Sequence, residues 1–303
     1  MSELNQIIKH LTYQINNNGT VSLKTSGTTG TPKVVSKNID VLYRNSKLNK
    51  EHTNNDVFGF LYNLDSWAAT SVIIYCIKNK ITPYNINIDS PIFEQLQDVT
   101  HLSITPTFLQ VIAMNLQDKK VTNIQKIILG GEYSTQETID LCKKIFPKSK
   151  IVTIYSSTET GDIASCSDMI EGFSKDKFQK YTFDDSNCLI KDGNNTGDIW
   201  ELHNGRYIFK GRIDSCIKVA GNLISLYDLE NKIKNITNIN DCVCIETDVP
   251  IIGKSYKLLY VGEEKKSDIK NKLKQALHKY EMPVLIKNVE AIGFGKNYKK
   301  ERQ

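Results

Sequence analysis

Short apolar runs alternate with stretches of helical length and periodicity between residues 57 and 154, and this alternation constrains the fold more than any other feature. Strands separated by single helices pair in parallel, because the helix returns the chain to the starting edge of the sheet. The pattern therefore predicts an α/β domain with a mostly parallel sheet. The expected strands are 57–62, 102–105, 127–129 and 151–154, and the expected helices are 66–78, 106–116 and 135–145.

The pattern changes after residue 165, where short polar segments carry turn signals such as Asp192-Gly193-Asn194-Asn195. From residue 197 onward the elements are typical of a smaller α+β module. Its expected strands are 199–202, 207–209, 243–246 and 257–261, and its expected helices are 226–234 and 268–280. We predict a large α/β domain over 1–213 and a smaller α+β domain over 214–303, joined by a hinge at Asp214.

Composition places the chain among globular proteins, with 303 residues, 40% hydrophobic and 24% charged. The net charge of +5 is spread along the sequence, which argues against nucleic acid as a partner and suits a small anionic substrate. The seven cysteines lack the paired spacing of a zinc site, so we expect reduced thiols. Residues 1–18 are polar and lack a long apolar core, so we expect a cytoplasmic protein without a membrane segment.

A loop rich in glycine and hydroxyl side chains follows an expected strand at 21–24 and precedes a strand and a helix expected from Ile39. Glycines let backbone N–H groups approach an anion, hydroxyls donate hydrogen bonds, and a lysine offsets negative charge. The spacing differs from that of P-loop ATPases. A flexible linker is the alternative interpretation, which the position between regular elements disfavours. We predict a polyphosphate-binding loop made of Thr25, Ser26, Gly27, Thr28, Thr29, Gly30, Thr31, Pro32 and Lys33.

This loop resembles the signature loop of the adenylate-forming superfamily, which includes acyl-CoA synthetases, adenylation domains of peptide synthetases and firefly-type luciferases. Further segments resemble the family's other motifs in the expected order. They are Gly130-Gly131-Glu132, Tyr155-Ser156-Ser157-Thr158-Glu159, Thr196-Gly197-Asp198, Gly211-Arg212-Ile213-Asp214 with 217–224, and Gly293-Phe294-Gly295-Lys296. Ser156 replaces the family's usual glycine, and the residues after Lys296 depart from the common form.

The resemblance assigns roles around the base and the metal. It implies that Gly131 and Glu132 lie beside adenine, that Tyr155 stacks on it, that Thr158 touches phosphate, and that Glu159 binds Mg2+. The alternative for Thr158 and Glu159 is the first turn of a capped helix.

The resemblance also assigns the sugar and the transition state. It implies that Asp198 binds both ribose hydroxyls, that Arg212 contacts ribose or phosphate, and that Lys296 is catalytic in adenylation. A polar turn is the alternative for 196–198, and a solvated lysine is the alternative for Lys296.

Together these resemblances imply ATP-dependent activation of a small carboxylic acid to an acyl-adenylate, with Mg2+ as metal. The usual second step is thioester formation with coenzyme A or with the phosphopantetheine of an acyl or peptidyl carrier protein. Two alternatives stay open: transfer to an amine or hydroxyl, and a non-catalytic nucleotide-binding relative. The identity of the acid and the oligomeric state also stay open.

The chain departs from the family in length, since its phosphate loop begins close to Met1 and the segment from Glu159 to Asp198 is short. We therefore expect an acid pocket that is small, open or completed by a partner subunit. Family layout places this pocket at 58–69, 105–108 and the segment before Gly130. Asp65 faintly resembles the aspartate that pairs with a substrate ammonium in amino-acid-activating members, but we predict that it is a helix N-cap.

Overall fold

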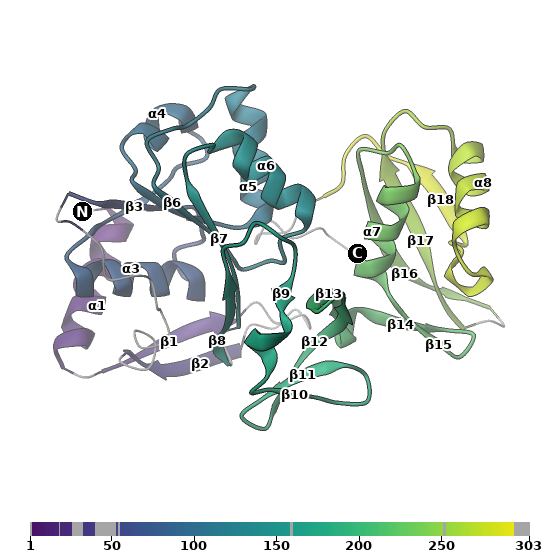
Figure 1. The fold of residues 1–303 in the computed structure, drawn as a ribbon, viewed down its shortest axis with the longest axis horizontal. Helices are drawn as coiled ribbons and strands as arrows, with labels where there is room; N and C mark the ends of the chain where they lie inside the picture. Colours follow the sequence, from purple (N-terminus) through teal and green to yellow (C-terminus); the bar gives the residue numbers. More distant parts are fainter. Residues whose placement is uncertain are drawn as a thin grey trace. The chain divides into compact units, whose positions relative to one another are not determined.

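The computed structural model describes residues 2–17, 19–25, 33–39, 53, 55–157, 160–250 and 253–293. The chain divides into two compact units, one of residues 1–180 with 204–206 and one of residues 181–203 with 207–303. Figure 1 shows their elements. The predicted domain boundary and hinge at Asp214 stay predictions.

A six-stranded sheet organises the first unit, in the order β4-β3-β5-β6-β7-β8. Every neighbouring pair is parallel except β7 with β8. The strands are β3 (Val57–Phe60), β4 (Thr82–Asn85), β5 (His101–Ile104), β6 (Lys126–Leu129), β7 (Lys150–Ser157) and β8 (Gly161–Cys166). The helices between them are α3 (Trp67–Asn79), α4 (Ile92–Gln97), α5 (Pro106–Leu116) and α6 (Gln136–Ile145). The predicted α/β class is confirmed.

Helices cover both faces of this sheet, because successive strand residues point to opposite sides. Phe58 and Phe60 of β3 pack into one core with α3 and with α1 (Glu3–Asn16). Leu102 and Ile104 of β5 pack into a second core with α4, α5 and α6. Figure 1 shows α3 and α5 on opposite sides of the strands.

The strand order reverses between β3 and β5. After β3 the chain runs through α3 to β4, whereas after β5 it runs through α5 to β6 on the other side. The helices that follow these two neighbouring strands therefore lie on opposite faces. In open α/β sheets, ligands bind at the carboxyl ends of the strands at such a point.

A loop of the first unit folds around one arginine. The guanidinium of Arg206 donates to the Asp168 carboxylate, at 2.8 Å from Nη1. It also donates to the backbone oxygens of Ile170, Glu171 and Gly172, at 2.9, 2.7 and 2.7 Å. These bonds explain why residues 204–206 belong to the first unit although their neighbours in sequence belong to the second.

The second unit begins with a sheet in which the strands follow the order β10-β11-β12-β13. An α+β module with its own apolar core, drawn from residues 217–286, comes after it. The sheet contains β10 (Thr182–Phe183), β11 (Cys188–Lys191), β12 (Asn194–His203) and β13 (Arg206–Arg212). The module contains β14 (Cys216–Val219), β15 (Asn222–Ser225), α7 (Leu226–Ile236), β16 (Asp241–Val249), β17 (Gly253–Val261), α8 (Lys266–Ala276) and β18 (Leu285–Asn288).

Most predicted elements of the described residues are confirmed, and the helix expected at 106–116 has the observed bounds. Sequence reasoning missed α1, β4, α4 and several strands after residue 165. The helix expected at 268–280 instead spans Lys266–Ala276. The helix expected from Ile39 lies outside the described residues except for Ile39 itself.

One expectation about a helix start is wrong. Ser66 is the N-cap of α3, with its hydroxyl accepting from the Ala69 N–H at 3.1 Å, so Asp65 is not the cap. The alternative of a capped helix start at Thr158 and Glu159 lies outside the described residues, between Ser157 at the end of β7 and Gly161 at the start of β8.

The cysteines carry free thiols, and five of the seven are buried. Among the described residues, no group of three or more His, Cys, Asp and Glu side chains is placed to hold a metal ion. None of the helices in the described part of the chain has the length and apolar character needed to cross a membrane.

Candidate nucleotide and acid site

The two ends of the predicted phosphate loop lie side by side. They terminate β1 (Thr20–Thr25) and β2 (Lys33–Asn38), an antiparallel pair in which Thr25 is opposite Lys33. The pairing closes the base of the loop, a more ordered arrangement than a flexible linker requires. The loop residues between these ends, Ser26, Gly27, Thr28, Thr29, Gly30, Thr31 and Pro32, lie outside the described residues.

Polar side chains occupy the carboxyl edge of the first unit's sheet at the reversal between β3 and β5. The hydroxyl of Tyr62, just after β3, lies 2.9 Å from the hydroxyl of Ser103 in β5. Burial raises the pKa of the Tyr62 hydroxyl, a hydrogen bond with Ser103 works to lower it, and the charge of Glu132 raises it further. The residues expected to form the acid pocket therefore include a phenol that stays protonated and is hydrogen-bonded to Ser103.

The turn Gly130-Gly131-Glu132 follows β6 at the same edge. Gly131 has a φ of +78°, which favours glycine. A Cβ on Gly130 would lie 2.6 Å from Cγ1 of Ile154, and one on Gly131 would lie 3.3 Å from Cγ2 of Thr105. The Glu132 carboxylate accepts from Thr107, at 3.1 Å from the backbone N and 2.7 Å from the hydroxyl. The turn is thus packed tightly against β7 and the start of α5.

We expect Gly130→Ala to destabilise the protein by about 1–3 kcal/mol, because the new methyl group overlaps the Ile154 side chain. Urea denaturation measures this change in the free energy of unfolding. The double variant with Ile154→Ala should lose less than the sum of the two single losses, because the shortened side chain makes room for the methyl group. Additive losses would contradict the overlap.

Tyr155 of β7 lies in an aromatic cluster. Its ring is parallel to that of Phe178, with 6.4 Å between centroids and 7° between planes, and Phe173 lies at the same centroid distance. The β7–β8 register shifts between Tyr155 and Ser156, where β8 has one extra residue, Ile163. The cluster fixes the ring at the carboxyl end of a parallel strand, and its stacking on adenine stays a prediction.

The second unit brings together the two residues expected at the ribose. The carboxylate of Asp198, which is only 7% exposed, accepts from Arg212 Nη1 at 2.9 Å. Arg212 also donates from Nε to Asp214 at 3.1 Å and from Nη1 to the Thr196 backbone oxygen at 3.3 Å. Burial works to lower the pKa of Arg212, but the carboxylates of Asp214 and Asp198 outweigh it and raise that pKa.

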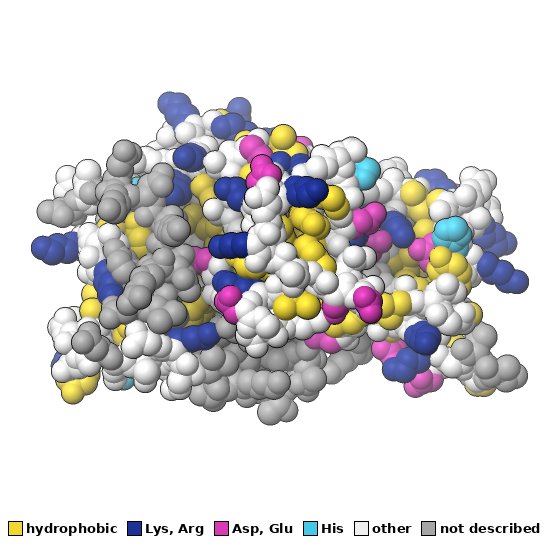
Figure 2. All heavy atoms as spheres, turned by 60° about the horizontal axis from the view of Figure 1, so that its bottom comes forward, with side chains coloured by type: hydrophobic (Ala, Val, Ile, Leu, Met, Phe, Trp, Pro, Cys, Tyr) yellow, Lys and Arg dark blue, Asp and Glu magenta, His cyan; other side chains and the backbone are white. Residues whose placement is uncertain are grey.

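Thr158, Glu159 and Lys296 lie outside the described residues, so their roles stay predictions. Sequence reasoning missed the Tyr62–Ser103 pair and the contact of Glu132 with Thr107. A polar residue directly after each of several parallel strands was the available signal. On the face shown in Figure 2, basic and acidic side chains are interspersed, in keeping with the spread of charge along the sequence.

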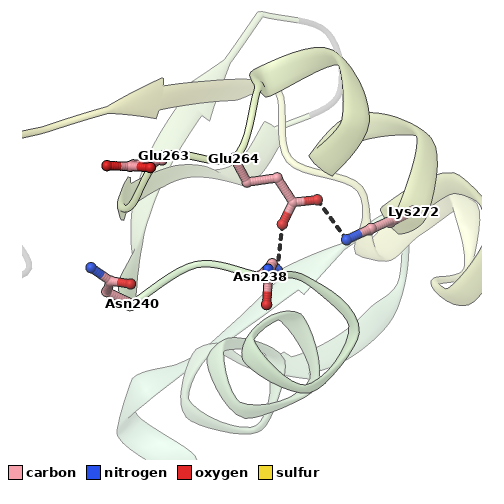
Figure 3. Close-up of a pocket in the computed structure, with 5 residues that line it drawn as sticks. All are labelled: Asn238, Asn240, Glu263, Glu264 and Lys272. Atoms are coloured by element: carbon pink, nitrogen blue, oxygen red, sulfur yellow. Dashed lines mark hydrogen bonds and ion pairs between the residues drawn. The ribbon is translucent and has the colours of Figure 1, made fainter.

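A hollow of about 600 Å³ in the second unit has no part in this site. Figure 3 shows its lining, where Glu264 accepts from the Asn238 backbone N–H and pairs with Lys272 at 2.6 Å. Asn240 and Glu263 complete the lining, which contains none of the predicted site residues.

Comparison with known proteins identifies the family. The profile of AMP-binding enzymes matches residues 23–197, more than half of the chain. The chain belongs to the AMP-binding enzyme family. The match runs from β1 to the turn before Asp198, and so includes the turn at 130–132 and Tyr155.

Individual relatives of this AMP-binding enzyme are distant. The D-alanine–D-alanyl carrier protein ligase of Lactococcus lactis is 23% identical over 352 residues, covering 95% of this chain and 69% of the relative. ATP-bound MatB of Rhodopseudomonas palustris has a TM-score of 0.76 at 15% identity, covering 91% of this chain and 65% of that one. MenE of Bacillus subtilis, an O-succinylbenzoate coenzyme A synthetase in complex with ATP and magnesium ion, has a TM-score of 0.72 at 17% identity, with 93% and 68% covered. The chain spans about two thirds of the length of these relatives.

Proposed function

We propose that this AMP-binding enzyme activates a small carboxylic acid with ATP, forming an acyl-adenylate and pyrophosphate. The observation that carries the proposal is the position of the family's motifs at one edge of the sheet. The turn at 130–132 and Tyr155 both lie at carboxyl ends of neighbouring parallel strands, beside the reversal between β3 and β5. Membership of the AMP-binding family supports ATP as the nucleotide.

Each part of ATP would be bound by a different group of residues. The loop from Thr25 to Lys33 holds the β- and γ-phosphates, Gly131 and Tyr155 enclose the adenine, and Asp198 with Arg212 binds the ribose. The positive φ of Gly131 and the tight packing around Gly130 leave backbone, without side chains, at the end of β6, which fits a flat base. The buried Asp198 carboxylate, fixed by Arg212, fits a pair of sugar hydroxyls.

Mg2+, held by Glu159, would neutralise phosphate charge. Lys296 offsets the charge that develops when a carboxylate approaches the α-phosphate, since the reaction joins two anions. The acceptor of the acyl group is proposed to be a thiol, on coenzyme A or on the phosphopantetheine of a carrier protein. The carrier-protein ligase and the coenzyme A synthetase among the relatives support this acceptor class. The small module after Asp214 would rotate between the two steps. We place the enzyme in the cytoplasm.

An amino acid is the acid class that we test first. Asp65 is exposed, and it is not the N-cap of α3, because Ser66 has that role. Its carboxylate follows β3 at the edge where the acid pocket is expected, and a carboxylate there suits a substrate ammonium. The similarity to a D-alanine ligase supports the same class.

For an amino-acid substrate, Asp65→Asn should raise the KM of the acid by about 10–100-fold, because a charge-assisted hydrogen bond contributes roughly 1.5–3 kcal/mol. The KM of ATP should change little. Steady-state exchange kinetics with each substrate varied in turn measure both constants. An unchanged KM for the amino acid would remove Asp65 from the pocket.

The proposed reaction is tested by exchange of labelled pyrophosphate into ATP, screened over fatty, aromatic and amino acids, with D- and L-alanine included. Exchange that depends on one class of acid is the expected result. If none of the acids supports exchange, the alternative holds, in which the protein binds a nucleotide but does not activate an acid.

A further inference from the structure

Glu132 occupies a place where two segments of the proposed site meet. β5 and β6 are neighbouring parallel strands, with Ile104 opposite Leu129. The segments that follow them, 105–108 and 130–132, therefore leave the sheet side by side. The proposed function gives the first segment to the acid and the second to the adenine.

The start of α5 needs a partner from elsewhere in the chain. The first N–H groups of a helix have no acceptor within the helix. Thr105 caps one of them, with its hydroxyl accepting from the Phe108 N–H at 3.1 Å, and Pro106 has no N–H to satisfy. The first turn contains no acidic residue of its own. The Thr107 N–H is left for another acceptor.

Glu132 supplies that acceptor from 25 positions further along the chain. Its Oε2 takes both the Thr107 N–H, at 3.1 Å, and the Thr107 hydroxyl, at 2.7 Å. A carboxylate at this position also interacts favourably with the positive end of the helix dipole. A steric contact also links the start of α5 to the glycine turn, because a Cβ on Gly131 would lie 3.3 Å from Cγ2 of Thr105.

We infer that Glu132 is a positioning residue that fixes the start of α5 against the glycine turn, and so couples the acid segment to the adenine segment. This inference rests on the proposed function for the identity of the two ligands. It gives Glu132 a different role from the direct nucleotide contact that the sequence predicts. In the positioning role the carboxylate acts through Thr107.

The test compares Glu132→Ala with Glu132→Gln, Thr107→Val and the double variant Glu132→Ala/Thr107→Val. Glu137→Ala is the matched control, because Glu137 is an exposed carboxylate in the first turn of the next helix, α6. Two properties are measured: amide hydrogen exchange of 105–109, and the KM values of ATP and acid in pyrophosphate exchange. Amide exchange reports on the helix start whether or not the protein adenylates anything.

For a positioning residue, Glu132→Ala should speed amide exchange at 105–109 about tenfold or more and raise both KM values together by about tenfold. Glu132→Gln can still accept from the Thr107 N–H, so its amide exchange at 105–109 and both of its KM values should stay close to those of the wild type. Thr107→Val should raise amide exchange at 105–109 and both KM values by a smaller factor, roughly threefold. The double variant should show no larger changes than Glu132→Ala alone. Glu137→Ala should match the wild type.

A rise in the KM of ATP alone, with amide exchange at 105–109 unchanged, would make Glu132 a nucleotide contact and overturn the inference. Additive effects in the double variant would also overturn it. If Glu132→Ala fails to fold, Glu132→Gln and Thr107→Val carry the same comparison. If pyrophosphate exchange is absent with every acid, the proposed function fails, whereas the amide exchange result still decides whether Glu132 holds the helix start.

Discussion

Lys296→Ala should lower acid-dependent pyrophosphate exchange by about 10²–10³-fold, the range seen when one group that stabilises transition-state charge is removed. The carboxylate and the triphosphate are both anions, so their approach requires a positive charge close to the α-phosphate. The KM of ATP should change much less than kcat, because this interaction strengthens in the transition state. Exchange kinetics at saturating and limiting ATP separate the two constants.

Lys300→Ala is the matched control for Lys296→Ala. Both lysines lie in the same basic segment, outside the described residues. If Lys296 were only a solvated lysine, the two substitutions would have the same small effect. Full exchange activity in Lys296→Ala would rule out the catalytic role.

Arg206→Met should destabilise the protein by about 3 kcal/mol, the second large effect that we expect. The substitution keeps a long apolar side chain but leaves the backbone oxygens of Ile170, Glu171 and Gly172 without their donor and Asp168 without its partner. Removing one partner of a buried ion pair lowers the free energy of unfolding by about 3–5 kcal/mol. We expect the lower end of this range, because the Asp168 side chain is 40% exposed. Guanidinium chloride denaturation measures the loss.

Lys144→Met is the control for Arg206→Met. It breaks the pair of Lys144 with Asp118, whose side chains are 67% and 86% exposed, and should change the free energy of unfolding by less than about 0.5 kcal/mol. Equal losses in the two variants would show that the loop around Arg206 contributes nothing beyond a surface pair.

The contribution of Arg206 should also depend on pH. Burial works to raise the pKa of Asp168, but hydrogen bonds from Arg206 and from the Ile170 N–H outweigh it and lower that pKa. A lowered folded-state pKa means that the stabilisation is fully present above the unfolded value of about 3.9 and is lost as the pH falls through the folded value. The stability difference between wild type and Arg206→Met should therefore shrink in strong acid.

Local signals predicted much of the fold. The helix at 106–116 was predicted to its ends because Thr105, Pro106 and the apolar period all act within one segment. The strands around it were predicted because four buried strands in succession need apolar runs. The mistaken cap at Asp65 shows the limit of such signals, since Asp65 and Ser66 are both good caps and the helix start decides between them.

Contacts between distant segments could not be predicted in the same way. Arg206 reaches the loop at 168–172, and Glu132 reaches Thr107, only because strand pairing brings those segments together. No local pattern marks either side chain for that partner. The resemblance placed Asp198 and Arg212 at one site, and the structure adds the 2.9 Å bond that joins them.

We propose that this AMP-binding enzyme cleaves ATP between the α- and β-phosphates to activate an acid. The most direct test of this proposal is to follow ATP labelled at the α-phosphate, together with the acid that supports pyrophosphate exchange. We expect label in an acyl-adenylate and AMP, with pyrophosphate released in equal amount and only when the acid is present. Label in ADP with release of inorganic phosphate, or AMP formed equally without the acid, would contradict it.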